Sequence, residues 1–243
     1  MADVAIPSAP KLDLGRVVRD TLAVTGKRPV FVIGLSFLLS GVPSFFGGVF
    51  ASHHMHPGFY FFSGWGVLHV IVLILLSAFL SASLYRLALG ELEGQTPAAN
   101  EVFTAGGQLF LPLFAVNLFY FLAVCLGLVL LVVPGVFIGL IWCVAGPALI
   151  DRHAGITQSF EESARLTRGN RWRLLGLFLL FALAAGFANA VFEALGFATN
   201  YASEGLFSGP RLLGSAILST AITALATPGL AAIYVQLREL KAG

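Results

Sequence analysis

Charge is what this sequence has least of: only 11% of its 243 residues are Asp, Glu, Lys or Arg. Soluble domains carry about 25% charged residues and about 45–50% apolar residues. Here 58% of the residues are hydrophobic, and the mean hydropathy is +0.90. A water-soluble fold of this size could not bury so much apolar surface, so we expect lipid to be its solvent.

Three further shortages exclude other classes of protein. The chain has two cysteines, Cys125 and Cys143, and because both fall inside apolar runs we expect packing residues and not a disulfide framework. The net charge of +2 is too small to indicate a nucleic-acid partner. The first residues contain no apolar stretch before a small-residue cleavage site, so no secretory signal peptide is expected.

Motifs for catalysis are also missing. No GxSxG or HExxH motif stands in a suitable context, no acids are paired within the apolar runs, and no GxxxxGK[ST] loop occurs. We therefore expect no enzyme and no cofactor. His53, His54 and His56 are close enough in sequence to bind Zn²⁺ or Cu²⁺. Because no Cys, Asp or Glu accompanies them, we interpret them as a polar loop and predict no metal site.

Six apolar runs are long enough to cross the hydrocarbon layer as helices. The predicted fold is an all-α membrane protein with six transmembrane helices in one polytopic domain, residues 1–243. The predicted spans are Val30–Phe50, Gly64–Tyr85, Leu109–Val132, Pro134–Ile150, Leu174–Ala198 and Leu212–Leu237.

The connection between the third and fourth spans, LVLLVVPGVFIGL, contains no polar residue. Pro134-Gly135 can break the helix there, but a turn of this composition would be unfavourable in water. We therefore expect the hairpin tip to be packed inside the protein, or the pair to form a re-entrant element.

Basic residues collect on one side of this threading. With the N-terminus inside, every Lys and Arg except Arg211 falls on the inner side. This distribution follows the positive-inside rule, so the N- and C-termini are predicted to be cytoplasmic.

Three segments before spans one, three and five resemble one another. They are DLGRVVRDTLAVTGKRPVFVIGL, PAANEVFTAGGQLFLPLFAV and GITQSFEESARLTRGNRWRLLGLFLL. Each has a helix-compatible stretch with an apolar stripe, then glycine, then polar residues, then the span. We predict three interfacial amphipathic helices that end near Gly26, Gly106–Gly107 and Gly169, and a threefold internal repeat of about 12–96, 97–154 and 155–243.

Spacing within these segments predicts which residues share a face. Glu161 and Arg165 are one turn apart and should pair on the polar side. Ser159 with Glu162, or else Thr157, should cap the third helix. The predicted apolar faces are Leu14, Val17, Val18, Thr21 and Leu22 in the first helix, and Ile156, Phe160 and Ala164 in the third.

The basic residues of these segments could hold lipid phosphates, since a juxtamembrane Lys or Arg contributes about 1 kcal/mol near an anionic surface. A tryptophan flanked by arginines marks the headgroup level. We therefore predict a non-enzymatic membrane protein that binds lipids, anionic ones above all, or serves as a scaffold or complex subunit, as a homo-oligomer or with a membrane-protein partner. The predicted headgroup-binding residues are Arg16, Arg19, Lys27, Arg28, Arg165, Arg168, Arg171, Trp172 and Arg173.

The alternative is a small-molecule or lipid transporter. Ser215, Ser219, Thr223 and Thr227 stand four residues apart on one face of the sixth span and could line a path. The same spacing also suits close helix packing in lipid. Ionisable residues within spans are functional candidates. The predicted polar cluster consists of His69, Asn189, Glu193, Ser215, Ser219 and Thr223.

One stretch carries a family resemblance. The matching features are Pro134-Gly135, Trp142, Pro147-Ala148, Gly155, Ser163 with Leu166-Thr167-Arg168-Gly169, and Arg171-Trp172-Arg173. On these, residues 97–185 resemble a bacterial membrane domain that precedes some glycerophosphoryl diester phosphodiesterases and also occurs as stand-alone proteins. The resemblance implies a six-span helical domain in the bacterial inner (cytoplasmic) membrane. It does not imply the phosphodiesterase activity, which belongs to a separate soluble barrel.

Overall fold

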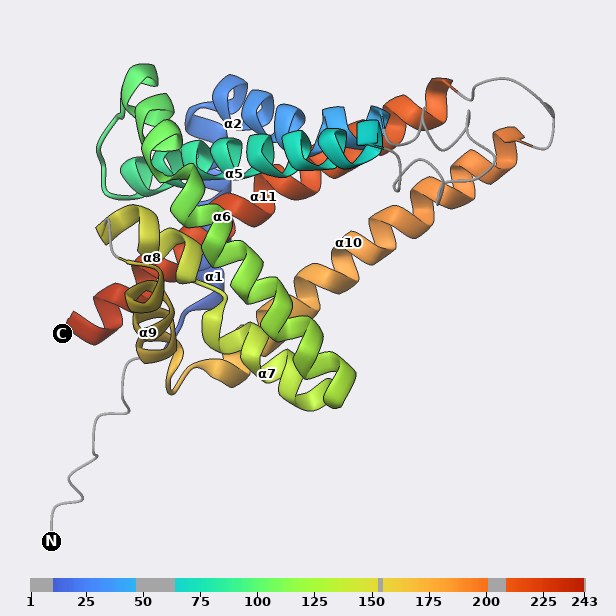
Figure 1. The fold of residues 1–243 in the computed structure, drawn as a ribbon. Helices are drawn as coiled ribbons and strands as arrows, with labels where there is room; N and C mark the ends of the chain where they lie inside the picture. The colour runs from blue at the N-terminus through green and yellow to red at the C-terminus, as the bar shows by residue number, and fades with distance from the viewer. Residues whose placement is uncertain (1–10, 47–63, 153–154, 201–208, 243) are drawn as a thin grey trace, which may run out of the picture.

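Almost all of the described part of the chain is helical. The computed structural model describes residues 11–46, 64–152, 155–200 and 209–242, and no strand occurs within these ranges. The helices, shown in Figure 1, are α1 (Leu14–Lys27), α2 (Pro29–Ser36), the π-helical turn η1 (Phe37–Gly41), α5 (Gly64–Leu92), α6 (Ala99–Leu130), α7 (Val132–Trp142), α8 (Ala145–Arg152), α9 (Ile156–Thr167), α10 (Arg171–Asn200) and α11 (Gly209–Ala242).

Six helical segments are long and apolar enough to cross a membrane, which confirms the predicted class. Their mean hydropathies lie between 1.7 and 2.5. The segments are Pro29–Phe46, Ile71–Leu92, Ala99–Leu130, Val132–Arg152, Arg171–Ala194 and Leu212–Ala242.

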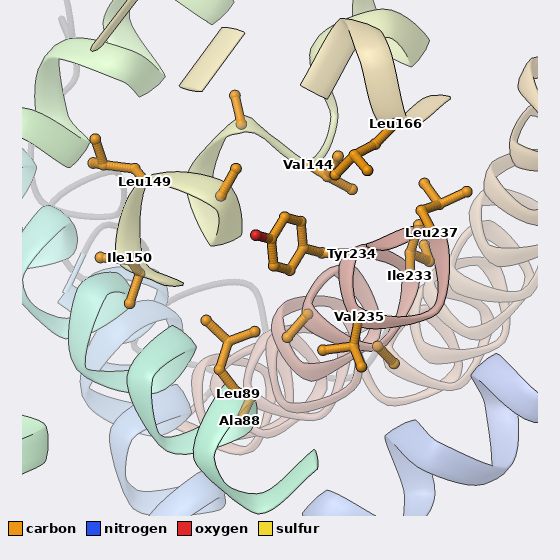
Figure 2. Packing of buried hydrophobic residues seen from close by; sticks show 14 of the residues in the cluster. Ala88, Leu89, Val144, Leu149, Ile150, Leu166, Ile233, Tyr234, Val235 and Leu237 are labelled. Carbon is orange, nitrogen blue, oxygen red and sulfur yellow. The ribbon is translucent and has the colours of Figure 1, made fainter. Parts of the chain in front are cut away.

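The largest buried cluster lies at one end of the bundle, where α8 enters between α5, α6, α9 and α11 (Figure 2). Every residue from Ala145 to Ile150 is buried, because these six residues of α8 are all apolar or glycine, and the charged Asp151 and Arg152 follow only at its end. In Figure 2 the Tyr234 ring lies in the middle of the cluster, and its hydroxyl points toward α8. The charged residues discussed below surround this cluster, so we call this end of the molecule the polar end. It comprises the start of α1, the α5–α6 connection, α8, α9, the start of α10 and the last turns of α11.

The predicted fourth span is two helices and not one. Between α7 and α8 the chain turns at Cys143 and Val144, and α9 satisfies the backbone groups freed there. Ser163 Oγ donates to Ile141 O at 2.8 Å and accepts from Val144 N at 3.3 Å. Thr167 Oγ1 also donates to Ile141 O. Such partners are needed because unpaired backbone groups are costly in a membrane protein.

The α6–α7 hairpin is held by a backbone contact between glycines. Leu131 is extended and separates the two helices. A Cβ on Gly127 would lie 2.7 Å from Gly135 Cα, so neither position has room for a side chain. The hairpin tip is exposed, with Val129 at 83% and Val133 at 77%. The alternative in which the tip is packed inside the protein is therefore wrong. Since α7 spans only about 16 Å, roughly half of a hydrocarbon core, the re-entrant element stays a prediction.

The second interfacial helix does not exist as a separate element. Helix α6 runs without interruption from Ala99 to Leu130. Gly106 does not end a helix but serves close packing, since a Cβ there would overlap Ser83 Oγ and lie 3.1 Å from Phe79 O on α5. The second predicted unit therefore has no separate short helix before its span, whereas α1 and α9 each precede a span as short helices. The threefold repeat itself stays a prediction.

The predicted apolar faces of α1 and α9 are only partly buried. On α1 the buried residues are Val17, Thr21 and Val24, whereas Leu22 is 56% exposed and Leu14 and Val18 are also exposed. On α9 the fully covered face carries small hydroxyl residues and Leu166, because these fit against α7 and α8. Ile156, Phe160 and Ala164 are only partly buried.

Two local predictions for α9 are also wrong. Arg165 pairs with Glu162 and not with Glu161, through two bonds of 2.8 Å. The N-cap is Gly155, whose N–H donates to Gln158 Oε1 at 3.2 Å, so neither Ser159 nor Thr157 caps the helix. Ser159 Oγ instead donates to the Gly155 carbonyl at 2.9 Å.

Gly26 and Gly169 were both predicted to end an interfacial helix, but replacing them by alanine should change stability in opposite directions. Gly169 has a φ of 93° in the α9–α10 turn, as predicted, so Gly169→Ala should destabilise by about 1–2 kcal/mol. Gly26 lies inside α1 with open space around it, so Gly26→Ala should stabilise by about 0.5–1 kcal/mol. Thermal unfolding of both variants in detergent checks this; shifts of the same sign would contradict the assignment.

Helix α10 leaves the bundle for much of its length, as Figure 1 shows. Leu183 is 63% exposed and Phe187 is 73% exposed. Near its far end α10 meets α11, where a Cβ on Gly214 would overlap the Phe192 ring. Away from this contact the two helices diverge, and the apolar surface of α10 that they leave exposed suits contact with lipid.

Candidate lipid-headgroup site

Six basic side chains of the polar end pair with acidic side chains of the same protein: Arg16, Lys27, Arg28, Arg152, Arg165 and Arg238. Arg238 lies at the centre of one network, with Nη1 2.8 Å from Asp151 Oδ2 and Nη2 2.6 Å from Glu93 Oε1. Tyr234 donates to the same Asp151 oxygen at 2.6 Å. This network joins α11 to α8 and to the end of α5.

Three of the four predicted headgroup ligands in α1 and at its C-cap are paired in the same way; the fourth is Arg19. Arg28 Nε lies 2.8 Å from Glu91 Oε1, and Lys27 Nζ lies 3.9 Å from Glu91 Oε2. Arg28 also donates to the Pro97 carbonyl at 2.9 Å. Arg16 pairs with Glu239 at 2.7 Å and with Asp20 at 3.5 Å. These contacts fix α1 to α5 and α11, so they explain why the cations lie there without any lipid.

Helix α9 carries a third group of paired charges. Glu162 lies between Arg165, at 2.8 Å, and Arg152, at 3.1 Å. The hydrogen bond from Arg165 lowers the pKa of the Glu162 carboxyl below its ordinary value, and Arg152 adds to this effect. The charge of Arg165 is therefore already compensated within α9.

Arg173 has a structural role. Its Nη1 donates to the Leu12 carbonyl at 2.7 Å, and Leu12 N–H donates to Asn170 Oδ1 at 3.0 Å. Leu12 is fully buried. These two bonds attach the segment before α1 to the start of α10.

Three of the predicted cations remain outside these networks: Arg19, Arg168 and Arg171. Arg19 and Arg168 are exposed, and neither forms an ion pair within the described ranges. Arg168 and Arg171 flank the α9–α10 turn, and the first turn of α10 holds no acidic residue. This turn therefore carries two positive charges that no acidic side chain of the described residues compensates, together with the positive end of the α10 dipole.

Arg171 is the most unusual of the three. Its guanidinium carbon lies 4.9 Å from the centre of the Phe137 ring, a cation–π contact between α10 and α7. Its Nε is buried without a hydrogen-bond partner in the described part of the chain. Beside it, Trp172 is 85% exposed. A buried donor without an acceptor costs free energy, so the hydrogen bonds of the Arg171 side chain are incomplete in the described part of the chain.

Three members of the predicted polar cluster form hydrogen bonds outside the cluster, and the cluster as a whole stays a prediction. Asn189 is exposed and donates to Ala185 O of its own helix. Ser215 donates to Leu212 O, also within its own helix. Ser219 packs against η1, donating to Ser40 O at 3.3 Å, and Ser40 Oγ donates to Ser219 O at 3.0 Å.

The remaining residues of the predicted polar cluster, of the Ser/Thr face of the sixth span and of the histidine loop are described only in part. Glu193 lies on the exposed side of α10. Thr227 is buried, and Thr223 is partly buried. The side chain of His69, and His53, His54 and His56 entirely, lie outside the described residues. Within those residues, no group of three His, Cys, Asp or Glu side chains could hold a metal ion.

The pairing of charges at the polar end is the feature that sequence reasoning missed. Glu91, Glu93 and Asp151 all follow an apolar run at the end where the basic residues collect. This common position could have predicted the ion pairs, because it places acidic and basic residues at the same end of the spans.

Fold and spans together define a multi-pass helical membrane protein. Comparisons with protein-family models, with curated proteins and with solved structures found no match to this chain. The resemblance to the membrane domain of glycerophosphoryl diester phosphodiesterases therefore stays a prediction.

Proposed function

We propose that this is a non-enzymatic protein of the bacterial inner membrane that binds anionic phospholipid headgroups at its polar end. On this proposal both termini face the cytoplasm. The polar end then lies at the cytoplasmic leaflet, where anionic lipids create a negative surface potential. Trp172 sits at the headgroup level as an interfacial anchor.

One observation carries the proposal: ion pairing separates the basic residues into two groups. Paired arginines already have their charge compensated by Glu91, Glu93, Asp151, Glu162 or Glu239. Arg168 and Arg171 do not, and they adjoin a helix N-terminus whose free N–H groups favour anions. A lipid phosphate supplies the negative charge that this turn lacks.

The packing of the sixth span argues against the transporter hypothesis, because it uses hydroxyl groups of the proposed path for contacts between helices. The hydroxyls of Ser219 and Ser40 bond each other's helix, and Thr220 is buried at the same contact. This arrangement is typical of small polar residues that join helices in lipid. We therefore favour lipid binding over a path along this face.

Native mass spectrometry of the protein extracted with its lipids tests the proposal. Arg171→Gln should reduce the retained phosphatidylglycerol or cardiolipin about fivefold, the effect of about one basic residue near an anionic surface. Lys241→Gln is the matched control, because it removes one exposed positive charge from the same end of the molecule. Equal anionic-lipid retention in both variants and the native chain would contradict the proposal.

A further inference from the structure

Helices α7 and α10 form an apolar groove that begins at the unpartnered arginine. It encloses about 490 Å³. Apart from Arg171, the residues that line it are apolar or glycine. They are Val132, Val133, Val136, Phe137 and Leu140 on one side and Gly169, Trp172 and Leu175 on the other.

We infer that this groove holds an acyl chain of one anionic phospholipid whose phosphate is bound by Arg171, an inference that rests on the proposed function. The groove has the amphipathic character of such a lipid. Its wall is hydrocarbon, and among the described residues that line it Arg171 alone is charged and has no acidic partner.

Charge decides the nature of the occupant. Arg171 and Arg168 both lack an acidic partner among the described residues, and the first turn of α10 contains no Asp or Glu. A phosphate accepts hydrogen bonds from a guanidinium and from the free N–H groups of a helix N-terminus at the same time. A neutral apolar occupant, such as a helix of another protein, would leave the positive charge of the Arg171 guanidinium without a counter-charge.

A second groove provides an internal comparison. Helices α1, α10 and α11 enclose about 320 Å³ against Val18, Leu22, Phe178 and Phe181, among others. None of the described residues that line it is basic, so they offer no means of selecting a charged headgroup. Only the α7–α10 groove should therefore prefer anionic lipid.

Trp172 lines the α7–α10 groove and can report its occupant. We would reconstitute the full chain, with Trp65→Phe and Trp142→Phe, in phosphatidylcholine vesicles that contain a minor fraction of dibrominated lipid. Bromine on an acyl chain quenches a neighbouring indole. Brominated phosphatidylglycerol should quench Trp172 more than brominated phosphatidylcholine at the same fraction, and Arg171→Gln should reduce this preference about fivefold.

Two substitutions that fill the groove test the acyl-chain part of the inference. Val136→Phe from α7 and Leu175→Phe from α10 should each abolish the excess quenching by brominated phosphatidylglycerol. Val129→Phe is the matched control, because Val129 is on the same hairpin but does not line the groove, and it should leave the quenching unchanged.

The outcomes separate the two proposals. If Arg171→Gln lowers the preference while both groove-filling variants keep it, headgroup binding stands and the groove inference is overturned. If the parent chain shows no preference for phosphatidylglycerol in quenching or in retained lipid, the proposed function fails and the groove inference fails with it.

Discussion

Arg238→Gln is expected to lower the free energy of unfolding by about 2–3 kcal/mol, the largest loss for a single charge at the polar end. Breaking a buried ion pair costs about 3–5 kcal/mol, and we take less because Arg238 is 27% exposed. The substitution leaves the carboxylates of Asp151 and Glu93 without their shared cation. Thermal unfolding in detergent should show a Tm about 5–10 °C lower.

Arg19→Gln is the control for this experiment. Arg19 is exposed and has no ion pair within the described ranges, so its loss should change stability by less than about 0.5 kcal/mol. Equal Tm values for the two variants would mean that the Arg238 network does not hold α5, α8 and α11 together.

Gly127→Ala is expected to destabilise the α6–α7 hairpin by about 2–3 kcal/mol, at the upper end of overpacking effects. The added Cβ would lie 2.7 Å from Gly135 Cα and 3.0 Å from Gly135 N, and backbone atoms cannot move aside as a flexible side chain can. Because α7 contacts α9 and α10, we also expect the groove beside Arg171 to change shape.

Gly107→Ala is the matched control, because this glycine lies in the same helix with no atom within 4 Å of an added Cβ. It should be neutral or slightly stabilising, since alanine favours helix more than glycine does. Tm measurements on both variants decide the matter, and a loss in Gly107→Ala as large as in Gly127→Ala would remove the steric explanation.

The spans could be predicted from sequence because run length and hydropathy alone determine them. The role of each glycine could not. Gly26, Gly106 and Gly169 all follow a helix-compatible stretch, yet only Gly169 adopts positive φ. Gly106 instead allows α6 to approach α5, a contact that depends on Phe79 and Ser83 more than twenty residues earlier.

The candidate site was predicted only in outline for the same reason. Neighbouring arginines look equivalent in RLTRGNRWR, but their partners are remote: Arg173 bonds Leu12. Likewise Arg28 pairs with Glu91, and Arg238 with Glu93, across the fold. Sequence locates the positive charge, whereas tertiary packing determines which cations remain available to a ligand.

The most direct test of this account is the lipid content of the native chain itself, measured by native mass spectrometry after gentle extraction from a bacterial membrane. We predict that the protein retains phosphatidylglycerol or cardiolipin at a defined stoichiometry and in excess over zwitterionic lipid. A chain that emerges free of lipid, or with lipids in the proportions of the bulk membrane, would contradict the claim that its polar end binds anionic headgroups.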